Sequence, residues 1–119
     1  MIKLFFSLIL ALILFFGGGC SSVSQAGYYW GNYSYTYLGT IREPSSKSDE
    51  AHMETLRKII DESETRNLRV PPGVYAELAN LIDKQGKSSV ALGYYKKEMK
   101  LYPESRIFIE RLLGGKNSE

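Results

Sequence analysis

The feature that most limits what this chain can fold into is an apolar run close to its N-terminus. After a short start that contains Lys3, residues 4–16 are Leu, Ile, Phe and Ala, interrupted only by Ser7. A positive start, an apolar run of about 7–15 residues and small residues at the end are typical of an export signal. A membrane-spanning helix needs roughly 20 residues, so this run is short for one. We therefore expect residues 1–19 to be a cleaved signal peptide and exclude them from the fold.

The only cysteine, Cys20, directly follows three glycines at the end of this run. A single cysteine excludes an internal disulfide and indicates another use of the sulfur. The arrangement resembles the lipobox of bacterial lipoproteins, although Gly17 stands where that pattern usually has Leu. The resemblance implies that the thiol receives acyl chains of the palmitate type and that Cys20 becomes the first residue of the mature lipoprotein. Two or three such chains hold a protein on a membrane far better than one.

Ser21, and not an Asp, follows the cysteine. By resemblance to Gram-negative lipoproteins, this implies sorting to the outer membrane, with the protein facing the periplasm. A plain secretory signal and an uncleaved N-terminal anchor are the alternatives. The 15 basic and 13 acidic side chains are nearly balanced and form no basic cluster, which argues against nucleic acid as a partner. Membrane attachment is therefore expected through the acyl chains alone.

The mature chain begins with two segments of contrasting composition. Residues 20–27 hold the lipidated cysteine and a small, polar, flexible tether. Residues 28–47 form a Tyr-rich segment and a loop, in which Tyr33, Tyr35 and Tyr37 alternate with Ser or Thr. This period of two predicts an extended segment.

From residue 48 to residue 115 the apolar spacing becomes helical. Proline and glycine divide the region into expected helices over about 49–67, 73–84, 88–101 and 104–113. On the last of these helices we expect the core-facing residues Ile107, Phe108, Leu112 and Leu113. Residues 116–119 form a polar tail.

The segment from Pro72 to Ser105 carries a pattern that resembles one tetratricopeptide repeat. The matching residues are Tyr75, Leu78, Ala79, Ile82, Gly86, Ala91, Tyr95 and Pro103. Glu98 departs from the pattern, which has a small residue there, and we expect it to face solvent. An ordinary helical hairpin that meets the spacing by chance is an equal alternative. Both readings predict a mainly α fold: a small helical domain with one αα-hairpin and flanking helices, preceded by the extended Tyr-rich segment.

Three landmarks together resemble an uncharacterised family of small bacterial outer-membrane lipoproteins. They are the aromatic start at residues 28–33, the Val-Pro-Pro-Gly turn at 70–73, and Tyr95 with the Tyr-Pro-Glu-Ser sequence at 102–105. The resemblance implies an envelope protein without assigned chemistry, often encoded beside lipoproteins related to the curli secretion pore.

The residue types that catalysis or metal binding requires are sparse in this chain. His52 is the only histidine, and we expect it to be a solvated surface residue beside Glu50 and Glu54. Lipidation would consume the only thiol, and no phosphate-binding or zinc motif is present. We therefore expect no enzyme, no cofactor and no metal site.

The Tyr-rich segment holds the candidate partner-binding residues Trp30, Tyr33 and Tyr35. Most of its rings are expected to pack across the helices, because tyrosine buries its ring while its hydroxyl stays wet. Trp30 and Tyr33 are expected to remain exposed, because the Gly31-Asn32 dipeptide between them indicates a turn.

The function that these observations favour is a lipid-anchored adaptor that binds another protein of the cell envelope. A structural subunit of a secretion or surface-assembly complex of the curli type is one alternative. A cell-wall-binding lipoprotein that stacks aromatic rings on glycans is another.

Overall fold

The computed structural model describes residues 1–2 and 27–115. The predicted signal peptide, Cys20, the tether up to residue 26 and the tail at 116–119 lie outside the described residues. Residues 27–115 contain helices and turns and no strand, which confirms the mainly α fold. The elements are α2 (Tyr33–Arg42), α3 (Ser46–Thr65), α4 (Val74–Lys84), α5 (Ser88–Leu101), the 3₁₀ helix η1 (Pro103–Ser105) and α6 (Arg106–Gly115). No helix in these described ranges is both long and apolar enough to cross a membrane.

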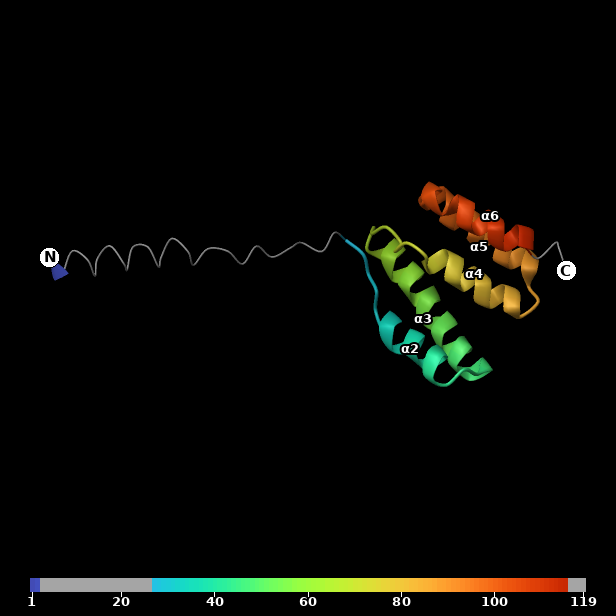
Figure 1. Cartoon of the computed structure of the whole chain (residues 1–119), viewed down its shortest axis with the longest axis horizontal. Helices are drawn as coiled ribbons and strands as arrows, with labels where there is room; N and C mark the ends of the chain where they lie inside the picture. Colours follow the sequence, from blue (N-terminus) through green and yellow to red (C-terminus); the bar gives the residue numbers. More distant parts are fainter. Residues whose placement is uncertain (3–26, 116–119) are drawn as a thin grey trace.

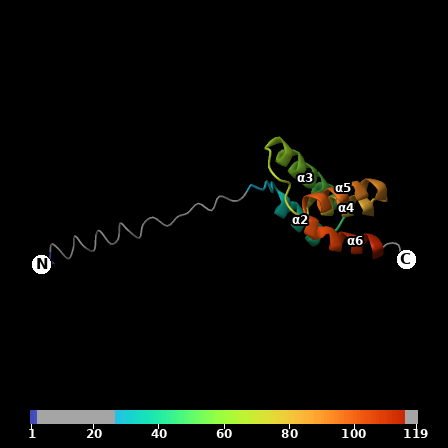
Figure 2. The same cartoon turned by 90° about the horizontal axis from the view of Figure 1, so that it is seen from above.

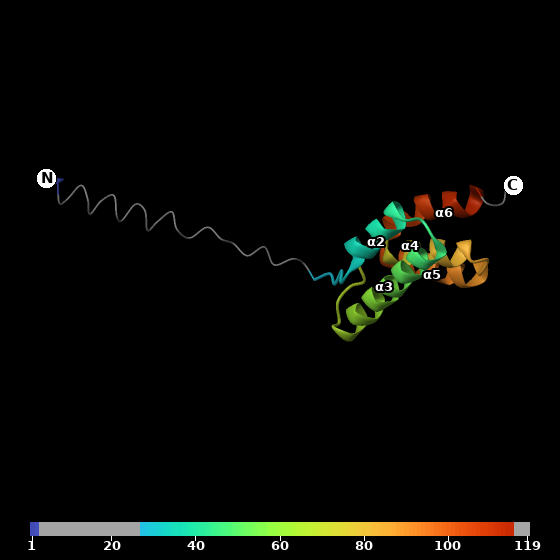
Figure 3. The same ribbon diagram turned by 90° about the horizontal axis from the view of Figure 1, so that it is seen from below.

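The helices form two pairs followed by a single helix (Figure 1). α2 packs on α3, α4 packs on α5, and α3 also contacts α4. In the turned views α2 and α6 lie on one side of the molecule and α3 lies on the other (Figures 2 and 3). Among the described residues α6 has no paired helix of its own, so one side of it stays uncovered.

The α4–α5 hairpin forms most of the core. Ala79 on α4 and Ala91 on α5 are fully buried, as expected for small residues where two helices cross closely. Leu78 is fully buried as well, and Tyr75 and Tyr95 fill the space beside the crossing. Gly86 ends α4 with a left-handed φ of 81°. The helical spacing and the positions of proline and glycine therefore predicted the hairpin and its boundaries correctly.

α3 begins slightly earlier than its sequence indicated, because Ser45 caps it. The Ser45 hydroxyl accepts a hydrogen bond from the Ser48 backbone N–H, and the Ser48 hydroxyl accepts one from the Ser45 N–H, which together form a capping box. From this start, helical spacing turns Met53, Leu56 and Ile59 toward α4, where all three are buried. A buried Val70 and the prolines after it then lead into α4.

The Tyr-rich segment is not extended, so that prediction was wrong. After a turn at Gly31 and Asn32, the chain forms α2, and the Tyr33 N–H bonds to the Trp30 carbonyl. In a helix, Tyr33 and Tyr37 lie on one face and Tyr35 on the opposite face. Packing against α3 overrides the strand preference of Tyr and Thr, which is a weak and context-dependent effect. No residue of α2 is buried.

The orientation of α6 also differs from the prediction. Ile109 is the residue of α6 that is fully buried, and Leu113 packs against the core one turn later. Ile107 and Phe108 are 65% and 62% exposed, and Leu112 is exposed as well. The helix therefore carries one apolar stripe facing inward and a second one facing solvent.

Candidate binding site

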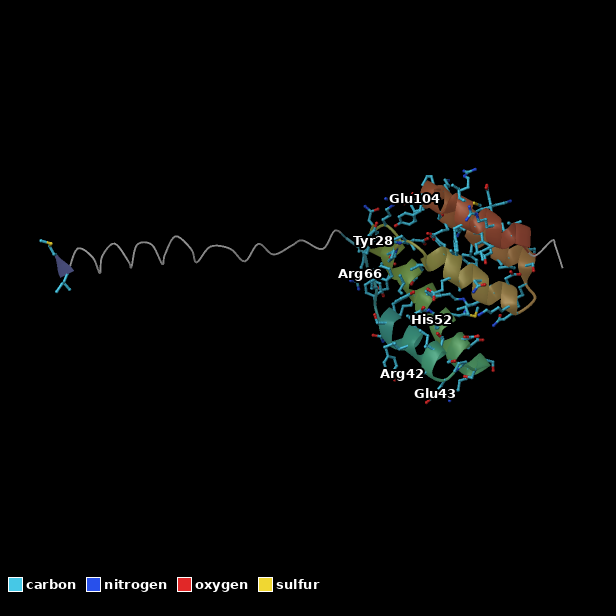
Figure 4. The ribbon with its side chains drawn as sticks, in the orientation of Figure 1. Tyr28, Arg42, Glu43, His52, Arg66 and Glu104 are labelled. Atoms are coloured by element: carbon cyan, nitrogen blue, oxygen red, sulfur yellow. The ribbon has the colours of Figure 1, made fainter. Side chains whose placement is uncertain are left out.

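His52 lies at the point where α2, α3 and α4 meet (Figure 4). The expectation that it is a solvated surface residue was wrong, because only 1% of it is exposed. Its Nδ1 lies 2.8 Å from the Thr36 hydroxyl on α2, and its Nε2 lies 3.0 Å from Glu77 Oε1 on α4. α2, where an extended segment was expected, covers the imidazole on the side of Thr36.

The hydrogen bonds around His52 form a closed set. The Glu77 carboxylate accepts from the Tyr33 hydroxyl at 2.7 Å through Oε2 and faces His52 Nε2 through Oε1. A carboxylate only accepts hydrogen bonds, so Nε2 carries a proton and donates it. In the neutral ring Nδ1 then accepts from the Thr36 hydroxyl. The network joins three helices through four side chains, and every polar atom in it that needs a partner has one.

Aromatic rings surround this network and connect it to the start of α2. The Tyr33 ring meets the His52 ring edge-on at a centroid distance of 5.3 Å and stacks on Tyr37 at 5.7 Å. Trp30 contacts Tyr33 edge-on at 5.3 Å. Such pairs favour fixed ring orientations beyond the area that they bury. α2 is therefore held on the bundle by aromatic and polar contacts and not by a buried apolar face.

The three predicted partner-binding residues have different environments. Tyr35 is 82% exposed and Trp30 is 41% exposed, so both rings are accessible. Tyr33 is half-buried, because it bonds to Glu77 and packs on His52. The structure thus brings Trp30 and Tyr33 together and turns Tyr35 away from them.

A groove between α4 and α6 is a surface that the sequence analysis missed. It has a volume of about 300 Å³, at the small end of ligand pockets, and is lined by Gly73, Ala76, Glu77, Asn80, Phe108 and Leu112. Its walls combine two residues of the outward apolar stripe of α6 with Gly73 and Ala76 and with the polar Glu77 and Asn80. A groove of this size suits one or two apolar side chains of a partner. The only sequence signal for it was the second apolar stripe of α6, which we had assigned to the core.

Glu77 links the groove to the His52 network. Glu77 is a lining residue of the groove, and its carboxylate accepts the hydrogen bonds of Tyr33 and His52. A ligand in the groove would therefore lie beside the group that fixes α2. This arrangement places the groove and the aromatic segment within one connected region.

Glu98 corrects another expectation. It was expected to face solvent, but only 2% of it is exposed. Its Oε1 accepts a 2.7 Å hydrogen bond from the Gly73 N–H, the residue that precedes α4. The carboxylate thus caps the first turn of the neighbouring helix, where the free N–H groups favour negative charge. Its second oxygen, Oε2, is buried without a hydrogen-bond partner.

Burial raises the pKa values of several tyrosines. Burial and then the hydrogen bond to Glu77 raise the pKa of Tyr33 well above its ordinary value. Burial, with the nearby Tyr28 hydroxyl, does the same to the pKa of Tyr102, and burial raises the pKa values of Tyr75 and Tyr95. Each of these tyrosines is therefore neutral over the physiological range.

Among the residues that the structure describes, no three His, Cys, Asp or Glu side chains come close enough together to hold a metal ion. The imidazole of His52 has both nitrogens engaged and almost no exposed surface. A general base must reach a proton of its substrate, which this ring cannot do in the observed packing. The observed contacts of His52 hold α2, α3 and α4 together.

Comparisons with known proteins place the chain in a family. The model of the domain of unknown function DUF4810 matches residues 28–112, which includes α2, both hairpin helices and most of α6. No curated protein and no solved structure matches the chain. Since the family match covers well over half of the sequence, the chain belongs to the family of the domain of unknown function DUF4810.

Proposed function

We propose that this protein is a non-catalytic adaptor, anchored by lipid in the outer membrane of a bacterial envelope, that binds another envelope protein through the α4–α6 groove. The observation that carries the proposal is the outward apolar stripe of α6. Phe108 and Leu112 stay exposed while Ile109, on the same helix, is fully buried. Exposed apolar side chains that line a groove are typical of a binding surface.

The position of α6 in the fold supports a helix, or an apolar segment, as the occupant of the groove. α2 and α4 are each covered by the helix that follows them, α3 and α5. α6 follows in the same series without such a helix in the described part of the chain. A partner helix that places apolar side chains against Phe108 and Leu112 would supply the missing cover.

Lipid anchoring through Cys20 is the second part of the proposal. It is supported by the apolar run at residues 4–16, the small residues before the cysteine and the absence of any other cysteine. Growth on labelled palmitate tests it directly. We expect label on the wild-type protein and none on Cys20→Ser; label retained by that variant would contradict the anchoring.

Site-specific photocrosslinking in intact cells tests the adaptor role. A photoreactive residue is placed at Ile107, the exposed neighbour of the groove-lining Phe108, and at Val90 on α5 as a control of similar exposure. We expect a discrete protein adduct from position 107 only, and we expect Phe108→Asp to abolish it. The same adducts from both positions, or none from position 107, would contradict the role.

The mass of the adduct separates the adaptor from its alternatives. An adduct with a different protein of the envelope supports the adaptor. A dimer of this chain would instead indicate a structural subunit that assembles with itself. Failure to form any protein adduct, with co-sedimentation of the protein on purified peptidoglycan, would favour a cell-wall-binding lipoprotein.

A further inference from the structure

α2 exposes a continuous apolar stripe on the side opposite its contacts with α3. Tyr35, Leu38 and Ile41 recur every three residues and are 82%, 44% and 58% exposed. We call these three residues the outer face of α2. The other side of the helix is occupied, because Tyr33 and Thr36 bond to Glu77 and His52.

The charge distribution of the chain singles out this helix. No residue from 4 to 41 carries a charge, and of the 15 basic and 13 acidic side chains only Lys3 precedes Arg42. All of the remaining charges lie from the end of α2 onward. The outer face of α2 can therefore enter an apolar or interfacial environment without the cost of removing a charge from water.

The residue types of this region are those that prefer the boundary between water and lipid. Tyrosine and tryptophan place an apolar ring in the membrane interface while a polar end stays hydrated. Tyr35 supplies such a ring on the outer face itself, whereas Trp30, which is also exposed, lies beside Tyr33 on the other side of α2. At the far end of the helix, Tyr35 and Leu38 border a recess against α3 that both Arg42 and Glu43 line, so the recess has no net charge to set against the apolar face.

The tether limits how far this helix can be from the membrane. If Cys20 is acylated, as the proposed function requires, only residues 20–26 separate the anchor from the described domain. Seven residues span at most about 25 Å when fully extended. α2 is the first helix after residue 27 (Figure 1), so along the chain it is the described helix nearest to the anchor.

We propose that the outer face of α2 docks on the phospholipid surface to which the protein is tethered. The acyl chains would supply the membrane attachment, and the helix would fix how the domain is oriented on it. This inference rests on the proposed lipid anchoring and is independent of what the α4–α6 groove binds. The partner-binding role expected from the sequence for Trp30 and Tyr35 then becomes the competing explanation for this surface.

A single tryptophan on the outer face itself reports on this contact, so the test uses Tyr35→Trp in a Trp30→Phe background, because Trp30 is the only natural tryptophan. The full lipoprotein with this reporter is reconstituted in phosphatidylethanolamine–phosphatidylglycerol vesicles, and the tryptophan fluorescence is measured with brominated lipid and with aqueous iodide as quenchers. We expect quenching by bromolipid and protection from iodide. The double variant Leu38→Glu and Ile41→Glu should reverse both results, while Val90→Glu and Leu92→Glu on exposed sites of α5 should change neither. Circular dichroism checks that each variant keeps its helices.

The outcomes separate this inference from the proposed anchoring. If the protein pellets with the vesicles but bromolipid does not quench the reporter tryptophan, the docking is overturned and the anchoring stays intact. Shielding of the reporter tryptophan from iodide that grows with protein concentration, without bromolipid quenching, overturns the docking in favour of a second copy of the chain. Protein that stays in the supernatant with an unmodified thiol contradicts both the anchoring and the docking.

Discussion

The α4–α5 hairpin and α2 are both helical, but they are held in the molecule by opposite means. α4 buries six residues, among them Leu78 and Ala79, whereas α2 buries none. α2 is attached instead by hydrogen bonds and ring contacts centred on His52 and Glu77. The difference suggests a division of roles, in which the hairpin supplies stability and α2 keeps its apolar side chains available for contact.

The largest expected effect is the loss of stability at alkaline pH, because high pH acts on several tyrosines at once. The raised pKa values of Tyr33, Tyr75, Tyr95 and Tyr102 apply only in the folded state. Above about pH 10, the ordinary tyrosine pKa, the unfolded chain loses these protons first and is stabilised. These tyrosines should therefore leave the free energy of unfolding unchanged below about pH 9 and lower it as the pH rises further. Thermal unfolding followed by circular dichroism checks this; unchanged stability up to about pH 11 would contradict the burial.

The same substitution in the two regions should give very different costs. Leu78→Ala removes a fully buried side chain from α4 and should lower the free energy of unfolding by about 2–5 kcal/mol. Leu38→Ala, in α2, removes an exposed side chain and should change it by less than about 0.5 kcal/mol. Urea unfolding of both variants measures the difference. Equal costs would mean that α2 is as tightly packed as the hairpin.

Glu98 tests whether a buried polar contact supports the hairpin. Glu98→Ala leaves the Gly73 N–H at the start of α4 without its acceptor and should cost about 1–3 kcal/mol. Glu110→Ala, on an exposed side of α6, serves as the control and should be close to neutral. If Glu98→Ala leaves the free energy of unfolding unchanged, the cost of burying the unpartnered Oε2 offsets the stabilisation that the cap contributes.

The smallest effect should come from the tyrosine that holds α2. Tyr33→Phe keeps the ring but removes the hydrogen bond to Glu77, at a cost of about 1–2 kcal/mol. Tyr35→Phe, on the opposite side of the same helix, should cost less than about 0.5 kcal/mol. Thermal unfolding of the two variants under identical conditions compares them. If Tyr35→Phe costs as much as Tyr33→Phe, the assignment of the two faces of α2 is wrong.

The hairpin could be predicted from sequence because all of its determinants are local. Apolar residues at helical spacing, the prolines at 71 and 72, and Gly86 fix where α4 and α5 begin and end. The small residues Ala79 and Ala91 mark the crossing without any knowledge of the rest of the chain. Such local patterns predict the folded structure because the tertiary contacts of α4 and α5 favour the same helices.

The environments of α2, His52 and Glu98 could not be predicted in this way. The Tyr-Ser-Tyr-Thr-Tyr alternation has the period of a strand, and only packing on α3 turns it into a helix. Without a helix at α2, no element was expected to cover His52, which was therefore expected to be solvated. Glu98 was judged by its departure from a repeat pattern, although its partner is the Gly73 N–H of the preceding helix in the hairpin. These three errors share one cause, since each depends on a contact between distant residues.

Native-state hydrogen exchange of the backbone amides tests the division between α2 and the hairpin most directly. We expect the amides of α4 and α5 to exchange only through global unfolding, and those of α2 through a local opening of lower free energy. Tyr33→Phe should lower the opening free energy of α2 more than that of the hairpin. If α2 is protected as strongly as α4, and Tyr33→Phe shifts both equally, the two regions form one cooperative unit and the division is wrong.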